Sequence, residues 1–176
     1  DTSGAARAAG AVALRHALNL GQGAALQTGI DFAFARGAER IVTFDADGQH
    51  SPADIPTLLA ALDTGADVAL GSRFLGRVEG VTPSRALFLR LAVRVSNAIS
   101  GLPLSDAHCG LRAFRASAAP ALRITQDRMA HASEILRNIR RHRLRFVEVP
   151  VTIRYTEYSR RKGQGADGRA PRPHAT

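Results

Sequence analysis

The sequence predicts a fold of the α/β class, in which helices flank a mostly parallel sheet. Apolar, β-branched stretches alternate with helical patterns through the first half of the chain, which is typical of such folds. Polar residues directly follow two of these stretches, namely Asp45, Asp47, Ser72 and Arg73. Ligands of parallel sheets bind beyond the carboxyl ends of the strands, so these four residues are the first candidates for a site. The 176 residues, 45% of them hydrophobic, suffice for one domain with a sizeable core.

In the first half of the chain, helices are expected over residues 1–10, 21–37 and 52–65, and strands over 11–16, 40–44 and 66–74. Gly37 and Gly65 stand at positions where helices commonly end. Ser51 is expected to cap the third helix, with Pro52 at its first position, where the missing N–H of proline has no consequence.

The second half is less regular. An amphipathic helix interrupted by arginines is expected over 84–101, a loop leading into a short strand over 102–115, a helix over 130–143 and a strand over 144–155. Pro150 lies inside the last strand, which is therefore expected to be an edge strand or to carry a bulge. Residues 156–176 are rich in Gly, Pro and Arg. We expect the folded domain to cover residues 1–155, followed by a basic loop and a flexible tail over 156–176.

The formal net charge of +9 comes almost entirely from arginine, since Lys162 is the only lysine. Arginine suits the binding of phosphate or carboxylate, so phosphorylated ligands, anionic lipid headgroups and nucleic acid are all candidate partners. The alternative is that the high arginine content reflects a GC-rich genome and not a binding function. Nucleic acid is the weakest candidate, because aromatic residues make up only 5% of the chain and the arginines are scattered.

Cys109 is the only cysteine, so neither an intramolecular disulfide nor a cysteine-based zinc site is expected. No apolar run is long enough to span a bilayer. Contact with a membrane would therefore take place at its surface, and the helix over 84–101 is either an interfacial helix or a core helix.

The pair Asp45 and Asp47 suggests a site for a divalent cation. Residues two apart in extended backbone point the same way, so both carboxylates can face one point, and Gln49 adds a neutral oxygen. Mg²⁺ and Mn²⁺ take such oxygen ligands and complete their shell with substrate phosphates. Two alternatives remain open: ordinary loop residues, or the nucleophile of a haloacid dehalogenase-like phosphatase. Against the phosphatase, Gln49 stands where its motif has Thr, and strands precede the motif.

Five segments in this order resemble one known family: NLGQGAALQTGI, FDADGQHSPADIP, DVALGSRF, LSDAHCGLRAFR and EVPVTIRY. They are similar to the inverting family 2 glycosyltransferases of GT-A fold, especially the polyprenyl-phosphate type that includes dolichol-phosphate mannosyltransferase. The resemblance covers nearly the whole chain. It implies transfer of a sugar, with inversion, from a nucleotide-diphosphate sugar of the UDP-glucose or GDP-mannose class to a lipid-phosphate acceptor.

The resemblance also implies roles for particular residues. Asp45, Asp47 and Gln49 match the motif that holds Mg²⁺ or Mn²⁺ on the donor diphosphate. Arg73, with Ser72 beside it, matches an arginine near the acceptor phosphate; the alternative for Arg73 is an ion pair within the protein.

Further roles fall in the second half of the chain. Asp106 and Arg112 match the acidic and basic residues of a catalytic segment, Asp106 as a general base or a ligand of sugar hydroxyls; the alternative for Asp106 is a loop aspartate. The basic trio Arg160, Arg161 and Lys162 matches a loop that closes over the phosphates, or is simply a solvated charge run.

Two departures from the family pattern matter. The chain is expected to lack the first two strands of the sheet, which supply much of the nucleotide-base pocket. Gln22, expected at the donor, stands where many relatives have Lys. A truncated or degenerate homologue without catalysis is therefore the main alternative. By resemblance we expect a cytoplasmic protein, peripheral on the inner face of the membrane.

Overall fold

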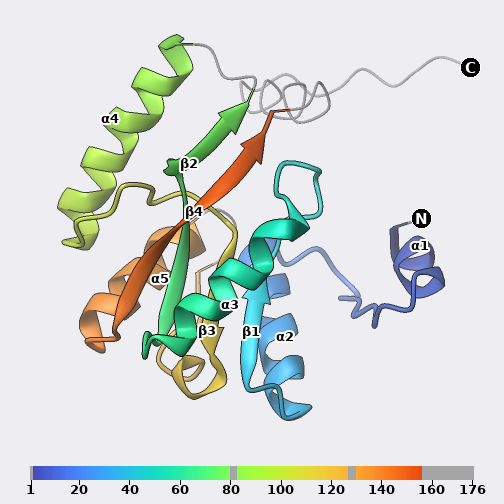
Figure 1. The fold of residues 1–176 in the computed structure, drawn as a ribbon. Helices are drawn as coiled ribbons and strands as arrows, with labels where there is room; N and C mark the ends of the chain where they lie inside the picture. The colour runs from blue at the N-terminus through green and yellow to red at the C-terminus, as the bar shows by residue number, and fades with distance from the viewer. Residues whose placement is uncertain (1, 80–82, 127–129, 156–176) are drawn as a thin grey trace, which may run out of the picture.

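A computed structural model describes residues 2–79, 83–126 and 130–155. Its four strands are β1 (Arg40–Thr43), β2 (Val68–Glu79), β3 (Arg112–Arg115) and β4 (Phe146–Arg154). Its α-helices are α1 (Thr2–Ala8), α2 (Gln22–Ala35), α3 (Ile55–Asp63), α4 (Pro83–Ser100) and α5 (Ala130–Arg141), and its 3-10 turns are η1 (Pro52–Asp54) and η2 (Ala116–Ala118). Helices lie on both faces of the sheet (Figure 1), which confirms the α/β prediction.

The sheet has the strand order β1-β3-β2-β4. β2 and β4 are parallel, whereas β3 runs antiparallel to both of its neighbours. Three of the described strands therefore share one direction, as expected, but two of the three adjacent pairs are antiparallel. β3 pairs with the first residues of β2, so the chain enters β3 opposite Leu70 and runs towards Val68.

Apolar side chains alternate between the two faces of the central strand β2. Val68 and Leu70 pack in the core that α2 and α5 cover, together with Ile139, while Ala69 packs on the opposite face with Leu62 of α3. This alternation follows from the two-residue period of a strand. In Figure 1, α3 accordingly lies in front of the sheet, and α2 and α5 lie behind it.

The two glycines predicted to end helices do so. Gly37 and Gly65 have φ values of 77° and 99°, in the left-handed region that glycine adopts without strain. Ser51 occupies the expected N-cap position, with Pro52 directly after it, but its side chain makes no capping hydrogen bond. The segment begins as the 3-10 turn η1, and the α-helix starts only at Ile55.

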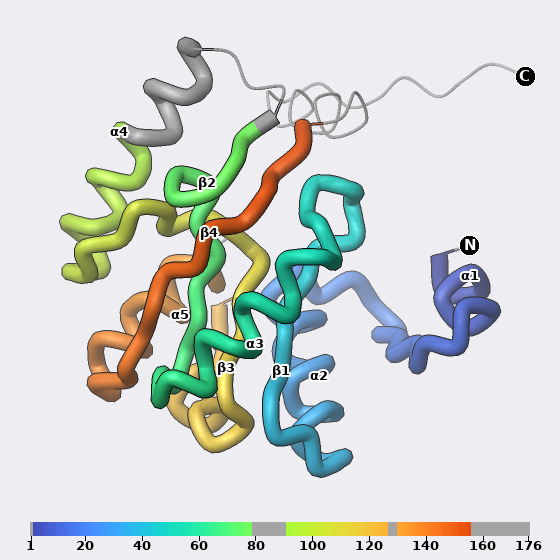
Figure 2. Tube along the Cα trace, viewed as in Figure 1, coloured from blue at the N-terminus to red at the C-terminus, as the bar shows by residue number. Residues whose placement is uncertain are grey.

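The strand expected over residues 11–16 does not form. Val12 and Leu14 are 62% and 45% exposed, and this segment, with α1, lies apart from the sheet (Figure 2). No described strand pairs with residues 11–16, and an unpaired strand leaves its backbone groups without partners. The expected helix at the start of the chain is present as α1, although none of its residues is buried.

β2 is longer than expected, since it continues past Phe74 to Glu79. Its pairing with β4 shifts register between Ser72 and Arg77. β4 pairs with β2 alone among the described strands, which confirms the prediction of an edge strand from Pro150.

Among the residues with a described placement, no helix is long and apolar enough to cross a membrane. Arg160, Arg161 and Lys162 lie outside the described residues, as do the side chains over 83–90.

Candidate functional site

A cavity of about 680 Å³ opens beside the carboxyl end of β1, on the face of the sheet that α2 and α5 cover. Its wall combines the first turns of α2 and α5, the segment after β1 and the segment around the start of β3. Its charged and polar lining side chains include Gln22, Asp45, Asp47, His108, Arg112 and His131. The fold thus brings together candidates from three parts of the sequence, namely Gln22, the pair Asp45 and Asp47, and Arg112.

Asp45 is held in place from several sides. Gln22 Nε2 donates a hydrogen bond of 3.1 Å to Asp45 Oδ1, and His50 Nε2 lies 3.6 Å from Asp45 Oδ2. Gly110 closes the third side, because a Cβ atom at this position would lie 2.3 Å from Asp45 Oδ2. A glycine at 110 is therefore what allows the carboxylate to lie against the backbone that precedes β3.

Asp47 lies in the turn that follows β1 and also lines the cavity. Its Oδ1 accepts a hydrogen bond of 3.1 Å from the Gln49 N–H. The side chain of Gln49, by contrast, is not part of the cavity lining. The backbone of Gln49 fixes the turn instead, since its carbonyl oxygen accepts a hydrogen bond from the N–H of Arg154 on β4.

A divalent cation would find two carboxylates in this cavity. No group of three or more His, Cys, Asp or Glu side chains arranged for a metal ion occurs in the described part of the chain. Mg²⁺ commonly binds through only one or two protein carboxylates and takes water and substrate phosphate as its other ligands. Asp45 and Asp47 therefore fit a cation that arrives with a phosphorylated ligand, but not a cation held by the protein alone.

Arg112 brings a positive charge to the same cavity. Its side chain is buried, with Nε donating to the Cys109 carbonyl oxygen at 2.9 Å and Nη2 donating to that of Ala107 at 3.4 Å. Burial lowers the pKa of Arg112, and the negative charges of Asp106 and Asp45 oppose this shift. A guanidinium remains charged under these conditions, so the cavity presents a cation as well as two carboxylates.

Arg73 and Asp106 form a buried ion pair. Asp106 Oδ2 accepts hydrogen bonds from Arg73 Nε at 2.6 Å and from the Arg73 N–H at 3.1 Å, while Arg73 Nη1 donates to the Tyr155 hydroxyl at 2.8 Å. Burial alone would lower the pKa of Arg73, but the Asp106 carboxylate and Tyr155 hold it above the usual value. Neither residue lines the cavity, and this arrangement favours the interpretation of Arg73 as a partner within the protein.

Ser72 is fully buried, and its hydroxyl lies 2.6 Å from that of Ser105. Its hydroxyl therefore contacts the loop before β3, and the residue does not line the cavity. Cys109 is also buried, and burial raises the pKa of its thiol to about 11, so its side chain is a packed apolar group with little thiolate.

Glu134 on α5 holds a neighbouring loop. Its carboxylate accepts hydrogen bonds of 2.9 Å from the N–H groups of Thr125 and Gln126. Burial raises the pKa of Glu134, but its hydrogen bonds to Thr125 and Gln126 outweigh this effect and leave the pKa below its usual value. This geometry gives Glu134 a structural function beside the cavity.

His131, Gly110 and Glu148 take part in or around the site without having been singled out in the sequence. His131 lines the cavity from the first turn of α5. The sequence carries no local signal for it, because a histidine at the start of a helix is common. Gly110 and Glu148 also lack a local sequence signal, because each acts through a contact with a residue far away along the chain.

Comparison with known proteins gives one matching family and several relatives. The profile of Glycosyl transferase family 2 matches residues 5–123, which include Asp45, Asp47, Arg73, Asp106 and Arg112. An uncharacterized protein of Methanocaldococcus jannaschii is 37% identical over 169 residues, which is 92% of this chain and 69% of the relative.

Other relatives carry functional names, and two of them illustrate the range of coverage. The UDP-N-acetylglucosamine–dolichyl-phosphate N-acetylglucosaminyltransferase of Methanococcus voltae is 33% identical over 86% of this chain and 62% of its own length. The polyprenol monophosphomannose synthase of Mycolicibacterium smegmatis is 38% identical over 54% of this chain and 37% of its own length. The chain thus spans about two thirds or less of the length of these relatives.

Proposed function

The chain belongs to glycosyl transferase family 2, and from this premise we propose that it transfers a sugar from a nucleotide-diphosphate sugar to a polyprenyl phosphate, with inversion at the anomeric carbon. One observation carries the proposal: Asp45, Asp47 and Arg112 line one cavity at the carboxyl end of β1. The donor is of the UDP-glucose or GDP-mannose class. Membership of this family makes the phosphatase and nucleic-acid hypotheses unnecessary.

The donor diphosphate binds at the carboxylate pair. Asp45 and Asp47 would hold Mg²⁺ or Mn²⁺, which supplies Lewis-acid stabilisation of the leaving diphosphate. Gln22 orients Asp45 through its 3.1 Å hydrogen bond, and the backbone of Gln49 orients Asp47. The guanidinium of Arg112, buried and charged, faces the negative charge that develops on the leaving group.

The acceptor is a phosphate that is already ionised near neutral pH, so the chain needs no strong general base and contributes mainly by orientation. Asp106 has this orienting role in our proposal. Its Oδ1 accepts a hydrogen bond of 3.1 Å from the His108 N–H, and His108 lines the cavity. Arg73 and Ser72 support the same loop from β2.

The basic trio Arg160, Arg161 and Lys162 is proposed to close over the phosphates. The N–H of Arg154 donates a hydrogen bond of 2.9 Å to Gln49, directly beside Asp47 and Asp45. Arg160 follows Arg154 by six residues, and a fully extended chain of that length spans about 20 Å. The division into a domain over 1–155 and a basic segment over 156–176 is part of this proposal.

The lipid part of the acceptor is proposed to lie along α4, at a membrane surface. Leu91, Val95 and Ile99 follow one another at four-residue spacing and are 57%, 53% and 64% exposed. They form an apolar stripe, and exposed apolar stripes on helices mark lipid or protein contacts. α4 is joined to the cavity wall because its Ser96 hydroxyl lies 2.9 Å from His108 Nε2.

The experiment is calorimetric titration of the chain with UDP and GDP, each with and without Mn²⁺. Binding of one nucleotide should require Mn²⁺ and should weaken at least about tenfold in Asp47→Ala, because changes even to residues behind a metal ligand cost about that much. Asp31→Ala is the matched control, since Asp31 is exposed on α2, does not line the cavity and accepts a hydrogen bond from Gln27 of the same helix. Equal binding without metal, or equal binding by Asp47→Ala, would refute the donor site. Metal-dependent binding without sugar transfer would identify a non-catalytic homologue.

A further inference from the structure

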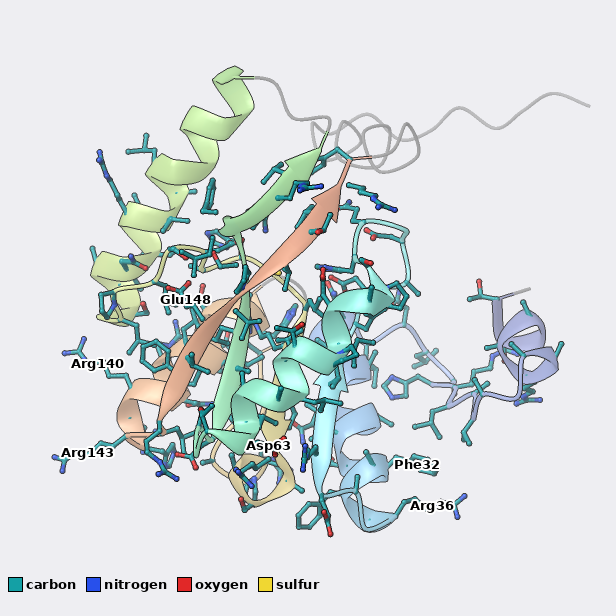
Figure 3. All side chains as sticks on the ribbon, in the orientation of Figure 1. Phe32, Arg36, Asp63, Arg140, Arg143 and Glu148 are labelled. Atoms are coloured by element: carbon teal, nitrogen blue, oxygen red, sulfur yellow. The ribbon has the colours of Figure 1, made fainter. Side chains whose placement is uncertain are left out.

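Glu148 on β4 makes an unusual set of hydrogen bonds to a single loop. Its carboxylate accepts the Ser105 N–H, at 2.9 Å from both Oε1 and Oε2, and the Ser105 hydroxyl at 2.8 Å. Oε1 also accepts the Asp106 N–H at 3.2 Å. Figure 3 shows Glu148 on β4 beside the loop that follows α4. One side chain thus satisfies three donors of two consecutive residues.

This loop, residues 101–111, contributes His108 and Gly110 to the cavity wall. Three residues beyond Ser105, His108 lines the cavity, and Gly110 lies against Asp45. The carbonyl oxygens of Ala107 and Cys109 accept the hydrogen bonds that orient Arg112. A change in the path of the loop at Ser105 would therefore move the carbonyl groups that orient the guanidinium of Arg112 in the cavity.

We propose that Glu148 is a positioning residue for sugar transfer, which acts by fixing the loop over 101–111 and touches neither donor nor acceptor. The inference rests on the proposed function for its catalytic consequence, but its structural part stands independently. Glu148 lies opposite Leu70 of β2 in the parallel pair, within the edge strand β4. The loop is thereby tied to a rigid element instead of to another loop.

A carboxylate suits this position, because both of its oxygens lie 2.9 Å from the Ser105 N–H and neither carries a hydrogen that would face it. In Glu148→Gln, an amide oxygen at the Oε1 position can still accept all three donors, but the NH₂ group at the Oε2 position faces the Ser105 N–H and cannot accept from it. Glu148→Ala removes all of these hydrogen bonds. The expected order of effects is therefore alanine, then glutamine, then wild type.

The experiment compares the full chain with Glu148→Gln, Glu148→Ala and the control Asp67→Ala. Asp67 is matched to Glu148, because its Oδ2 also accepts a hydrogen bond from a backbone N–H, that of Arg145, at 2.8 Å. Asp67 directly precedes β2, at the end of the sheet opposite the cavity. Amide hydrogen exchange reports on local opening at each site. Mn²⁺-dependent nucleotide binding reports on the donor site, and the rate of sugar transfer reports on the transfer step.

In Glu148→Ala, exchange at Ser105 and Asp106 should accelerate at least about tenfold relative to Asp67→Ala, because both N–H groups lose their acceptor, and Glu148→Gln should lie between alanine and wild type. The turnover number should fall about tenfold or more, since sub-ångström to 1 Å misplacements of catalytic groups cost up to about a hundredfold. Mn²⁺ affinity should stay within about threefold, because Asp45 and Asp47 follow β1. All rates are compared at the same interval below each variant's melting temperature.

Unchanged protection of Ser105 and Asp106 in Glu148→Ala would overturn the proposal. So would an equal loss of turnover in Asp67→Ala, since that outcome would mark a general effect of stability. If the wild type binds no nucleotide and transfers no sugar, the proposed function fails, and the exchange data still decide whether Glu148 holds the loop.

Discussion

Gly110→Ala is the sharpest test of how the cavity is built. A Cβ atom at position 110 would lie 2.3 Å from Asp45 Oδ2 and 3.2 Å from Asp45 Cγ. Real Cβ atoms essentially never approach closer than 3.0 Å, so the carboxylate oxygen must retreat by at least about 0.7 Å. The φ value of Gly110 is not in the left-handed region, so alanine meets no backbone strain and the effect is purely steric.

The backbone cannot relieve this contact freely. The Thr43 hydroxyl donates a hydrogen bond of 2.9 Å to the Gly110 carbonyl oxygen, and Thr43 is paired with Arg112 across β1 and β3. The Asp45 side chain is expected to move instead, which breaks its hydrogen bond from Gln22. A misplacement of about this size costs on the order of tenfold to a hundredfold in affinity or rate. Overpacking costs the fold about 1–3 kcal/mol.

The assay is calorimetric titration with Mn²⁺ and nucleotide, accompanied by thermal unfolding. Gly29→Ala is the matched control: Gly29 lies inside α2, and a Cβ there would meet nothing within 4 Å. That control should keep full binding and gain up to about 1 kcal/mol, because alanine favours helix more than glycine does. If Gly110→Ala binds Mn²⁺ and nucleotide as the wild type does, Asp45 is not a ligand in the position described.

Two further predictions concern buried groups. The pKa of Glu134 is lowered in the folded state, so its stabilising contribution is fully present above its usual value of 4.5 and is lost as the pH falls through the lowered folded-state value. The difference in unfolding free energy between wild type and Glu134→Gln should therefore be constant near pH 7 and shrink below pH 4.5; a difference independent of pH in urea titrations would contradict the hydrogen bonds to Thr125 and Gln126. Cys109, with a pKa of about 11 and 2% exposure, should resist a thiol reagent at pH 8 in the folded protein and react fully in denaturant, and rapid modification of the native protein would refute its burial.

Much of the fold was predictable because its signals are local. Glycines at 37 and 65 end helices through their own backbone freedom, and Pro150 marks an edge strand because it cannot donate a hydrogen bond. The segment 11–16 shows the limit of such reasoning. Its apolar residues favour a strand, but a strand exists only when another strand pairs with it.

The site divides in the same way. Asp45, Asp47 and Arg112 were identified from their motifs, and the fold places all three around one cavity. Arg73 and Asp106 were matched to residues near the acceptor and the sugar, with an ion pair within the protein as the alternative for Arg73, and the fold pairs the two residues with each other in the interior. A motif reports which residue types a family uses, but it does not report which of them contact one another.

The sequence by itself determined the α/β class, most of the helices and strands, and three of the residues that line the cavity, Asp45, Asp47 and Arg112. Only the tertiary structure decided that Arg73 pairs with Asp106, 33 residues away, and that Glu148 holds Ser105, 43 residues away. Local patterns follow from backbone geometry and hydrophobic period, which short segments carry within themselves. Contacts between distant side chains depend on how the strands are ordered in the sheet, and β3, inserted between β1 and β2, is the element that sets that order.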